Sequence, residues 1–412
     1  MTLDVCLNQL MRELETLATF SDDPAPAVTR IVFSQEDRQA RTWLKELCAG
    51  AGLSIREDAV GNTFARWEGS APELPAVASG SHIDAIPHSG RYDGTVGVLG
   101  ALEAIRALQR AGVRPRRSIE LVLFTSEEPT RFGIGCLGSR LMSGTLDPLR
   151  ADDLRDSQGE GLDELLAAAG FSGPLASVAL PAGHYHAFVE LHIEQGPLLE
   201  RAGIPLGIVT AIAAPATLRI EIEGEGGHAG AVLMPDRRDA FLAAAEVALA
   251  VESAAKATGA IDTVGTVGIC GIFPGAVNSI PSIATMLADV RDIDLARRDA
   301  VLEAIRNRAG AIAAARRVTI RISTVNADRP AEASPLVVDA LRSSAARQGL
   351  EYQPMVSRAY HDSLFMARIV PAGMLFIPCR AGVSHRPDEY AAPDDIERGV
   401  RVLAMALARL AE

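Results

Sequence analysis

The first third of the chain carries a strand-helix-strand pattern in which polar side chains follow both strands. Residues 75–78 and 119–124 are short apolar runs of the kind buried in parallel sheets. Between them, residues 97–111 have the apolar periodicity of a helix. Such units build α/β sheets, which bind ligands at the carboxyl ends of their strands. His82 and Glu127 come just after the two runs, so we expect them at a functional site.

A second alternation of strands and helices begins near residue 213. We expect the order β-α-β-α-β at residues 217–223, 239–257, 283–291, 296–314 and 318–325. After Pro335 we expect one more helix and a strand at residues 373–378. The sequence thus predicts an α/β fold with a mixed-sheet catalytic domain at residues 1–212 and 330–412. A smaller α+β lid or dimerisation domain, residues 213–329, is inserted into it.

Size and charge narrow the class of protein. The chain has 412 residues, more than a single hydrophobic core usually serves. Its net charge is −12, and no run of Lys or Arg suggests a nucleic-acid partner. No stretch of about 18 uncharged apolar residues is present, so we expect no membrane span.

The spacing of the cysteines and the composition of the first residues indicate the cellular compartment of the protein. The five cysteines are widely spaced and include no C-x-x-C pair, which argues against a disulfide framework and a structural zinc ribbon. Residues 1–20 mix charged with apolar side chains, as an amphipathic helix does and a secretory signal does not. We therefore expect a cytoplasmic protein.

Histidines and carboxylates gather in a few short clusters. These are Gly80-Ser81-His82-Ile83-Asp84, Tyr92-Asp93-Gly94, Glu127-Glu128, His192-Ile193-Glu194-Gln195 and Ser384-His385. Mixtures of imidazole and carboxylate bind borderline divalent metals, and a metal pair needs a carboxylate that bridges it. Three histidines and two carboxylates can meet that need and leave one carboxylate to accept a proton.

Each cluster also has an ordinary structural explanation. A histidine after a strand is more often a surface or hydrogen-bonded residue than a metal ligand. Adjacent glutamates are usually solvated, and the glycines around Asp93 could form a simple turn. The recurrence of these clusters at strand ends is what favours a metal site.

The clusters resemble those of the hydantoinase/carbamoylase branch of the di-metal metallo-exopeptidases, which includes allantoate amidohydrolases and N-carbamoyl amino acid hydrolases. The resemblance covers nearly the whole chain and rests on His-x-Asp, Tyr-Asp-Gly, Glu-Glu, His-Ile-Glu-Gln-Gly-Pro, Gly-His-Ala-Gly and a late Ser-His. It implies a two-metal amidohydrolase. Manganese is suggested by the ureide-degrading members, and zinc, cobalt or nickel also suit these ligands.

The resemblance assigns the metal ligands residue by residue. His82, Asp93 and His192 would bind one metal ion. Asp93, Glu128 and His385 would bind the other, so that Asp93 bridges the pair.

Three further residues would support the chemistry. Glu127 would be the general base, and Asp84 would orient the imidazole of His82. His228 would donate to the tetrahedral oxyanion, although the residue by itself could equally be a loop histidine. In the family this histidine belongs to the inserted domain and reaches the active site of the partner subunit, which implies a homodimer.

Substrate contacts follow from the same resemblance. Asn278 and Arg291 match a clamp for the substrate carboxylate, since a guanidinium binds carboxylate bidentately. Arg291 could instead form a surface salt bridge with Asp289 or Asp292. Gln195 would lie beside the ureido group.

Two motif variants point to the ureidoglycolate-hydrolysing subgroup of the branch. They are Ser-Glu-Glu-Pro-Thr-Arg-Phe-Gly at residues 126–133 and Ala-Tyr-His-Asp-Ser at residues 359–363. Tyr360 would narrow the pocket, unless it is a buried packing residue, and His361 would bind the substrate beside it. We therefore expect hydrolysis of ureidoglycolate to glyoxylate, ammonia and carbon dioxide. The alternatives are allantoate or an N-carbamoyl-L-amino acid as substrate and, more distantly, a dipeptidase or a non-catalytic binding protein.

Overall fold

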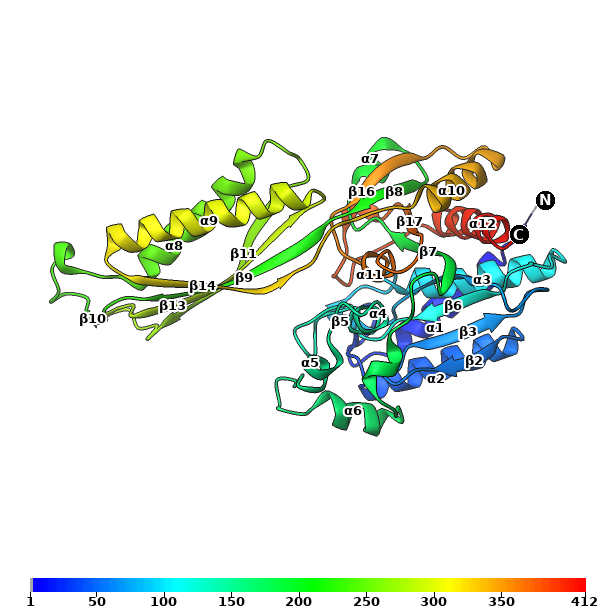
Figure 1. The fold of residues 1–412 in the computed structure, drawn as a ribbon, viewed down its shortest axis with the longest axis horizontal. Helices are drawn as coiled ribbons and strands as arrows, with labels where there is room; N and C mark the ends of the chain where they lie inside the picture. Colours follow the sequence, from blue (N-terminus) through cyan, green and yellow to red (C-terminus); the bar gives the residue numbers. More distant parts are fainter. Residues whose placement is uncertain (1–2) are drawn as a thin grey trace. The chain divides into compact units, whose positions relative to one another are not determined.

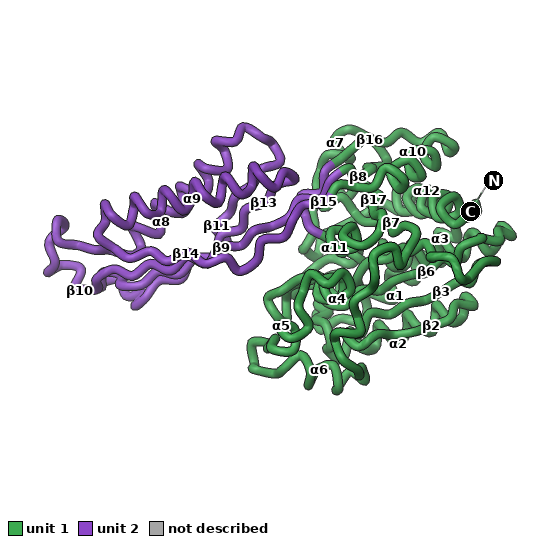
Figure 2. The backbone as a smooth tube through the Cα atoms, in the orientation of Figure 1, with its two compact units in different colours: residues 1–210, 332–355, 361–412 green, residues 211–331, 356–360 purple. Residues whose placement is uncertain are grey.

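The computed structural model describes residues 3–412, which form two compact units (Figure 2). Unit 1 comprises the chain up to Thr210 together with Glu332–Met355 and His361–Glu412. Unit 2 comprises Ala211–Ala331 and the short segment Val356–Tyr360. Residues 1 and 2, at which the predicted N-terminal helix starts, lie outside the described residues; helix α1 runs over Leu7–Thr19.

Unit 1 is built on a mixed β-sheet, as the sequence predicts. Its strands lie in the order β15 (Ala331–Glu332), β8 (Gly207–Ile212), β17 (Ala372–Ile377), β7 (Tyr185–Ile193), β4 (Ala76–Ser81), β6 (Ile119–Leu123), β3 (Thr63–Trp67) and β2 (Ser54–Glu57), with β16 (Gln353–Ser357) also paired to β8. The central strands β17, β7, β4 and β6 run parallel, while β8 and β3 are antiparallel to their neighbours. The carboxyl ends of four parallel strands therefore meet at one edge of the sheet.

Helices cover both faces of this sheet, which is why its strands are continuous apolar runs. In β6, Ile119 and Leu121 face one hydrophobic core and Val122 faces the other. The first core includes side chains of α1, α2 (Gln35–Gly50), α3 (Thr95–Arg110), α10 (Pro335–Arg347) and α12 (Pro393–Leu410). The second includes side chains of α4 (Leu137–Met142), α5 (Pro148–Asp152), α6 (Leu162–Ala169), η1 (Leu175–Val178) and α11 (Asp362–Met366). Figure 1 shows α12 packed beside α3.

Helix α3 lies unusually close to the sheet. A Cβ atom added to Gly97 would lie 2.4 Å from the carbonyl oxygen of Leu191 in β7, so only glycine permits this approach. The residue before the helix, its N-cap Gly94, has a φ of +66°, which is also a glycine conformation. The start of α3 is consequently held against the carboxyl ends of β4 and β7.

Unit 2 is a four-stranded antiparallel sheet with two helices on one face. The strand order is β11 (Val264–Phe273), β13 (Ile283–Asp292), β9 (Ala214–Glu223) and β14 (Thr319–Ala327). In β9, buried Leu218 and Ile220 alternate with exposed Arg219 and Glu221, the pattern of a sheet covered on one face. The cover is α8 (Ala240–Ala257) and α9 (Leu295–Arg316), which run along the same side of the sheet in Figure 1.

Strand β11 is an addition to the predicted pattern, so unit 2 has the order β-α-β-β-α-β rather than β-α-β-α-β. Its sequence contains Gly265, Gly268 and Gly271, which weaken the strand signal, and its residues are mostly exposed because it forms an edge of the sheet. A short pairing of β10 (Gly227–His228) with β12 (Ser279–Ile280) lies beyond this sheet.

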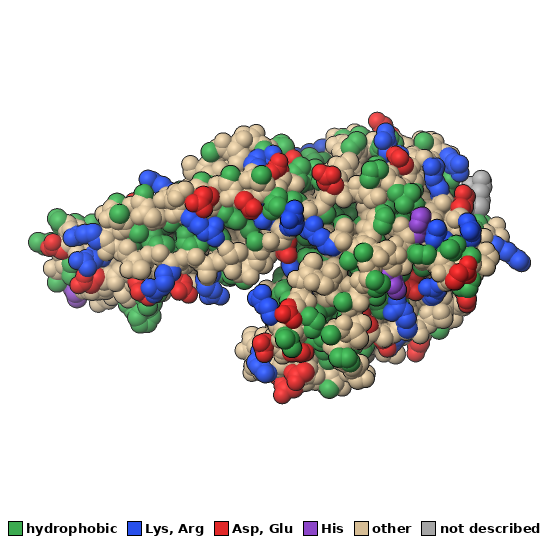
Figure 3. Space-filling view, in the orientation of Figure 1, with side chains coloured by type: hydrophobic (Ala, Val, Ile, Leu, Met, Phe, Trp, Pro, Cys, Tyr) green, Lys and Arg blue, Asp and Glu red, His purple; other side chains and the backbone are tan. Residues whose placement is uncertain are grey.

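The remaining described elements are short. They are β1 (Val28–Arg30), β5 (Ala85–Ser89), α7 (Leu198–Ala202), η2 (Met234–Asp236) and η3 (Arg380–Gly382). Over the faces visible in Figure 3, acidic and basic side chains are interspersed within each unit. Among residues 3–412, no helix combines the length and the apolar character needed to cross a membrane.

Candidate metal centre

The predicted metal ligands of unit 1 come together at the carboxyl edge of the parallel strands. They are placed as follows: His82 after β4, Glu128 after β6, His192 as the next-to-last residue of β7, His385 beyond β17 and η3, and Asp93 just before α3. All of them are buried except His385, whose side chain is 46% exposed. The sheet therefore gathers residues that are far apart in the sequence into one cluster.

Asp93 joins two groups of side chains. Its Oδ1 lies 3.2 Å from Nε2 of His192 and 3.7 Å from Nε2 of His82. Its Oδ2 lies 3.2 Å from Nε2 of His385, which is in turn 3.3 Å from Oε1 of Glu128. In each of the two resulting triads the possible ligand atoms lie within 4.8 Å of one another. A carboxylate that presents one oxygen to each triad has the arrangement that a bridged metal pair requires.

The orientation of two imidazoles also fits metal binding. Nδ1 of His82 lies 3.0 Å from the backbone oxygen of Asp84, and Nδ1 of His192 lies 2.9 Å from that of Ile193. A carbonyl oxygen can only accept, so each Nδ1 carries a hydrogen, and each Nε2, which faces Asp93, is left to hold a second proton or to bind a cation. Backbone carbonyls commonly orient metal-binding histidines in this way, so the residues present fit divalent cations.

The charges of the cluster depend on one another. Burial by itself would raise the pKa of Asp93, but hydrogen bonds from His192, His385 and His82 hold it well below its ordinary value. Hydrogen bonds to Asp93 and Glu128 raise the pKa of His385 to about 11. The buried carboxylates thus require positive partners, either protonated imidazoles or cations.

Asp84 acts on two segments at once. Its carboxylate accepts the backbone N–H groups of Glu127 at 3.2 Å and Glu128 at 3.0 Å. The same carboxylate stays 3.6 Å from Nδ1 of His82, which the backbone oxygen of Asp84 contacts instead. The side chain of Asp84 therefore fixes the loop after β6, and its main chain orients His82.

Glu127 is a buried carboxylate beside the cluster. Its Oε2 lies 3.7 Å from Nε2 of His82, and its Oε1 accepts a hydrogen bond from Sγ of Cys136 at 3.4 Å. Burial raises the pKa of Glu127 well above its ordinary value; the His82 imidazole opposes this effect, and the carboxylates of Glu128 and Asp362 add to it. A carboxylate with a raised pKa is suited to take up and release a proton.

A third group of possible ligands, Glu190, His192 and His361, is better explained as structural support. The carboxylate of Glu190 already accepts from Oγ of Ser81 at 2.7 Å and from Oγ and the backbone N–H of Ser363 at 2.6 and 3.2 Å. The ring of His361 is buried, with its centroid 4.5 Å from that of His192. The predicted substrate residue His361 thus lies directly beside the candidate centre.

Gln195 has a free acceptor next to the cluster. Its Nε2 donates to Oδ2 of Asp93 at 2.7 Å, whereas its buried Oε1 has no hydrogen-bond partner among the described residues. Its φ of +55° is unfavourable for a residue other than glycine, and such strain concentrates at functional sites. The side chain can therefore accept a hydrogen bond from a ligand.

Two predicted residues of unit 2 are brought together by the β10–β12 pairing. His228 pairs with Ser279, and the backbone N–H of Ala229 donates to the oxygen of Asn278 at 2.9 Å. His228 and Asn278 are both exposed.

The other two predicted residues of unit 2 also lie close together. The guanidinium of Arg291 is 5.7 Å from the ring centroid of Tyr360. The sequence left open whether Arg291 forms a salt bridge with Asp289 or Asp292. The structure contains the salt bridge with Asp289, whose Oδ1 lies 2.7 Å from Nε of Arg291. Tyr360 is partly exposed rather than fully buried.

Three contacts of the centre are not predicted from the sequence. Glu389 and Ser384 both bond to Asp93, as described below, and Cys136 bonds to Glu127. Ser384 stands in the late Ser-His motif without a role of its own there. A glutamate four residues after His385 and a single cysteine carry no signal in one sequence.

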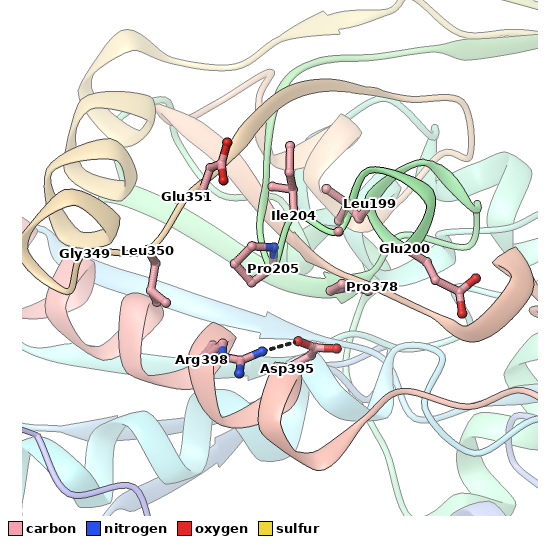
Figure 4. Close-up of a pocket in the computed structure, with 11 residues that line it drawn as sticks. Leu199, Glu200, Ile204, Pro205, Gly349, Leu350, Glu351, Pro378, Asp395 and Arg398 are labelled. Atoms are coloured by element: carbon pink, nitrogen blue, oxygen red, sulfur yellow. Dashed lines mark hydrogen bonds and ion pairs between the residues drawn. The ribbon is translucent and has the colours of Figure 1, made fainter.

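A cavity of about 530 Å³ lies elsewhere in unit 1 (Figure 4). Its walls include Leu199, Ile204, Pro205 and Leu350, with Arg398 paired to Asp395 at 2.8 Å on one side. None of the predicted site residues lines it. The candidate centre is therefore identified by its chemistry and not by this cavity.

Comparison with known proteins defines the class of this chain. The profile of peptidase family M20/M25/M40 matches residues 78–409, and the chain belongs to that family. It is 56% identical to the ureidoglycolate hydrolase of Oryza sativa subsp. japonica, over 97% of this chain and 84% of that protein. It is 54% identical to the ureidoglycolate hydrolase of Arabidopsis thaliana, over 99% of this chain and 87% of that protein.

A likeness to solved structures agrees with this result. Crystal structures of AtUAH in complex with glyoxylate and with (S)-hydroxyglycine match with a TM-score of 0.92 and 53% identity, over 99% of this chain and 98% of that one. The resemblance to the ureidoglycolate-hydrolysing subgroup that the motifs indicate is thereby confirmed.

Proposed function

We propose that the protein hydrolyses the ureido C–N bond of ureidoglycolate. The observation that carries this proposal is Asp93, shared between two His/carboxylate triads beside the buried carboxylate of Glu127. The choice of substrate is supported by the 56% and 54% sequence identity of this chain to two ureidoglycolate hydrolases. The two ligands of AtUAH are also products of this chemistry: ureidoglycolate and water give hydroxyglycine, carbon dioxide and ammonia, and hydroxyglycine loses ammonia to leave glyoxylate.

The donor set supports two divalent cations per chain. His82, Asp93 and His192 would hold one, and Asp93, Glu128 and His385 the other. Bound there, the cations would polarise a carbonyl group and lower the pKa of water. Manganese is the metal we propose, and zinc, cobalt or nickel suit the same donors.

The protein's own residues would move the proton. Glu127 takes a proton from water as the water oxygen attacks the ureido carbonyl carbon, and then delivers it to the nitrogen whose C–N bond breaks. The Cys136 thiol, 3.4 Å from Oε1 of Glu127, restrains this carboxylate. The free Oε1 of Gln195 would accept an N–H of the ureido group, and His361 would contact the substrate beside it.

Residues of unit 2 would recognise the substrate carboxylate and the developing oxyanion. Arg291 and Asn278 would bind the carboxylate, with Tyr360 next to the guanidinium of Arg291. His228 would donate to the oxyanion. The exposure of His228 and Asn278 supports a role toward another surface.

We further propose a homodimer in which His228, Asn278 and Arg291 serve the partner's site. The edge strand β11 supports this proposal, because Ile269, Ile272 and Phe273 on it are exposed. An apolar strand at the edge of a sheet has one free side, along which a strand of a second chain can pair.

We place the protein in the cytoplasm. All five cysteines are free, and Cys48, Cys136 and Cys379 are buried among them. Unpaired cysteines support a reducing compartment.

The experiment that tests the function is a substrate panel. Protein stripped of metal and reloaded with manganese is assayed for release of ammonia and glyoxylate from ureidoglycolate, and of ammonia from allantoate and several N-carbamoyl-L-amino acids. We expect a clear preference for ureidoglycolate. Preference for another ureido compound would reassign the substrate and keep the amidohydrolase mechanism, whereas binding of metal without any hydrolysis would favour a binding protein.

A further inference from the structure

Glu389 is a buried carboxylate with no role among the candidate ligands or the proposed acid-base groups. It is 4% exposed and lies between His385 and the start of α12. Its Oε1 accepts the backbone N–H groups of Tyr92 at 2.7 Å and Asp93 at 3.2 Å. One carboxylate oxygen near the C-terminus of the chain thus holds the main chain on which Asp93 stands.

The other carboxylate oxygen of Glu389, Oε2, is connected to the side chain of Asp93 through the hydroxyl group of Ser384. Oγ of Ser384 lies 2.8 Å from Oε2 of Glu389 and 2.8 Å from Oδ2 of Asp93. Oδ2 is the oxygen that faces His385, and Ser384 directly precedes that histidine. Glu389 therefore connects the segment that bears Asp93 with the segment that bears His385.

The backbone is shaped to admit this side chain. A Cβ atom on Gly90 would lie 2.4 Å from Cβ, Cδ and Oε1 of Glu389, so any larger residue at position 90 would displace the carboxylate. His385 has a φ of +60°, a conformation that needs support from its surroundings when the residue is not glycine. Ser384 and Glu389, which lie one residue before and four residues after His385, both contact Asp93.

We propose that Glu389 is a positioning residue that fixes the two oxygens of Asp93 between the two triads and sets the affinity of the centre for its metals. This inference rests on the proposed metal centre. Because Asp93 is the residue common to both triads, a small rotation of its carboxylate affects both at once. Groups that orient metal ligands in this way contribute about 10–100-fold to metal affinity.

The contacts define a graded set of variants. Glu389→Gln keeps an oxygen acceptor for the two backbone N–H groups and directs an amide N–H at Oγ of Ser384. Glu389→Ala removes every one of these contacts. Ser384→Ala removes the hydroxyl that links Oε2 of Glu389 to Oδ2 of Asp93 and that accepts from Nε2 of Gln195 at 3.4 Å, but it keeps the two backbone contacts of Glu389. Glu103→Ala is the matched control, because Glu103 is also fully buried, lies in α3 and accepts the backbone N–H of Cys6 at 2.7 Å.

The test is a calorimetric titration of the metal-free, full-length chains with manganese alone, after circular dichroism has shown that each variant is folded. We expect about 10–100-fold weaker manganese binding for Glu389→Ala, a smaller loss for Ser384→Ala, and near wild-type binding for Glu389→Gln. The control should bind manganese as the wild type does.

Two results would overturn this inference while leaving the proposed metal centre intact. They are unchanged manganese affinity in folded Glu389→Ala, with Ser384→Ala equally unaffected, and an equal loss of affinity in the Glu103→Ala control. If Glu389→Ala does not fold, Ser384→Ala decides the question, because unchanged manganese affinity in that variant would overturn the inference. A wild-type chain that takes up no manganese would instead overturn the proposed metal centre, on which the inference rests.

Discussion

The carboxylate of Asp84 accepts the backbone N–H of Glu128 at 3.0 Å, so an aspartate that follows one strand positions a residue that follows the neighbouring strand. The strands concerned, β4 and β6, are parallel partners in the sheet. This contact and its companion to Glu127 make the geometry of both glutamates depend on one side chain that is not in either candidate triad.

Asp84→Asn should therefore disturb catalysis without removing a ligand. An amide keeps one acceptor and turns an N–H group toward a backbone N–H, which costs about 1–3 kcal/mol for a buried group. We expect kcat to fall about tenfold for each 1.4 kcal/mol of lost positioning. Asp37→Asn is the control, since the buried Asp37 accepts the backbone N–H of Phe33 and pairs with Arg41 in α2. Equal losses of kcat in the two variants at equal stability would refute the positioning role.

Gly94→Ala should abolish metal binding at the triad of His82. A Cβ atom at this position would lie 2.4 Å from Nε2 of His82, in the space that a ligand atom needs. Gly112→Ala serves as the control at the other end of α3, because Gly112 has a similar φ of +70° and nothing within 4 Å of an added Cβ. Both variants carry the backbone penalty of about 1–2 kcal/mol, but only Gly94→Ala should bind less metal in equilibrium dialysis. Equal metal content in both would contradict the clash.

Glu127→Gln should keep both metals and lose turnover. The amide fills the same space but cannot take a proton, and loss of a general base costs about 10²–10⁴-fold in rate. The measurement is kcat with metal content determined on the same sample. Retained activity at full metal loading would exclude Glu127 as the base.

Mixed subunits test the proposed sharing of a site across a homodimer. Glu127→Gln and His228→Ala chains are each expected to be inactive as pure dimers. A hybrid of the two has one site with both native residues if His228 acts across the interface, so activity should partly return on mixing. Hybrids shown to form but to remain inactive would place His228 in the site of its own chain or in none.

The stability of the metal-free protein should depend on pH through Asp362. Burial first, and then the charge of Glu190, raise the pKa of Asp362 to about 8, above the value of about 3.9 in an unfolded chain. Between these two values the unfolded chain releases a proton that the folded chain retains, so stability falls as pH rises from about 4 to about 8 and levels off above that range. Asp362→Asn should flatten this slope in urea unfolding at several pH values. An unchanged slope would show that Asp362 is ionised when folded.

The sequence sufficed for the fold because central strands of unit 1, such as β6 and β17, are short apolar runs followed by polar residues. Strand β6 lies at Ile119–Leu123, against a predicted run of 119–124, and β17 at Ala372–Ile377, against 373–378. Strand β11 could not be predicted in this way. Its side chains face solvent at a sheet edge, so no alternation of apolar and polar residues records the pairing with β13.

For the candidate metal centre, the sequence predicts the side chains that can bind a metal. It does not predict the residues that position those side chains through contacts with the backbone. His82 and Asp93 stand out because their side chains are chemically distinctive after strands. The contacts of Glu389 to the N–H groups of Tyr92 and Asp93 depend on how two distant segments fold together, which one sequence does not contain. The carboxylate of Asp84 illustrates the same limit, because its partners are main-chain atoms.

Strand β17 is the last strand in sequence, yet it lies in the interior of the sheet between β7 and β8, and His385 follows it. A nascent chain still lacking residues beyond 371 therefore has no strand between β7 and β8, and it lacks His385, one of the three residues of the second triad. The two triads can be completed only after nearly all of the protein has left the ribosome. Loading of both proposed metal ions would in this sense be a late event in synthesis: a chain that ends before His385 has an incomplete second triad, and binding of two metal ions per chain would report that the C-terminal segment has been made and has docked.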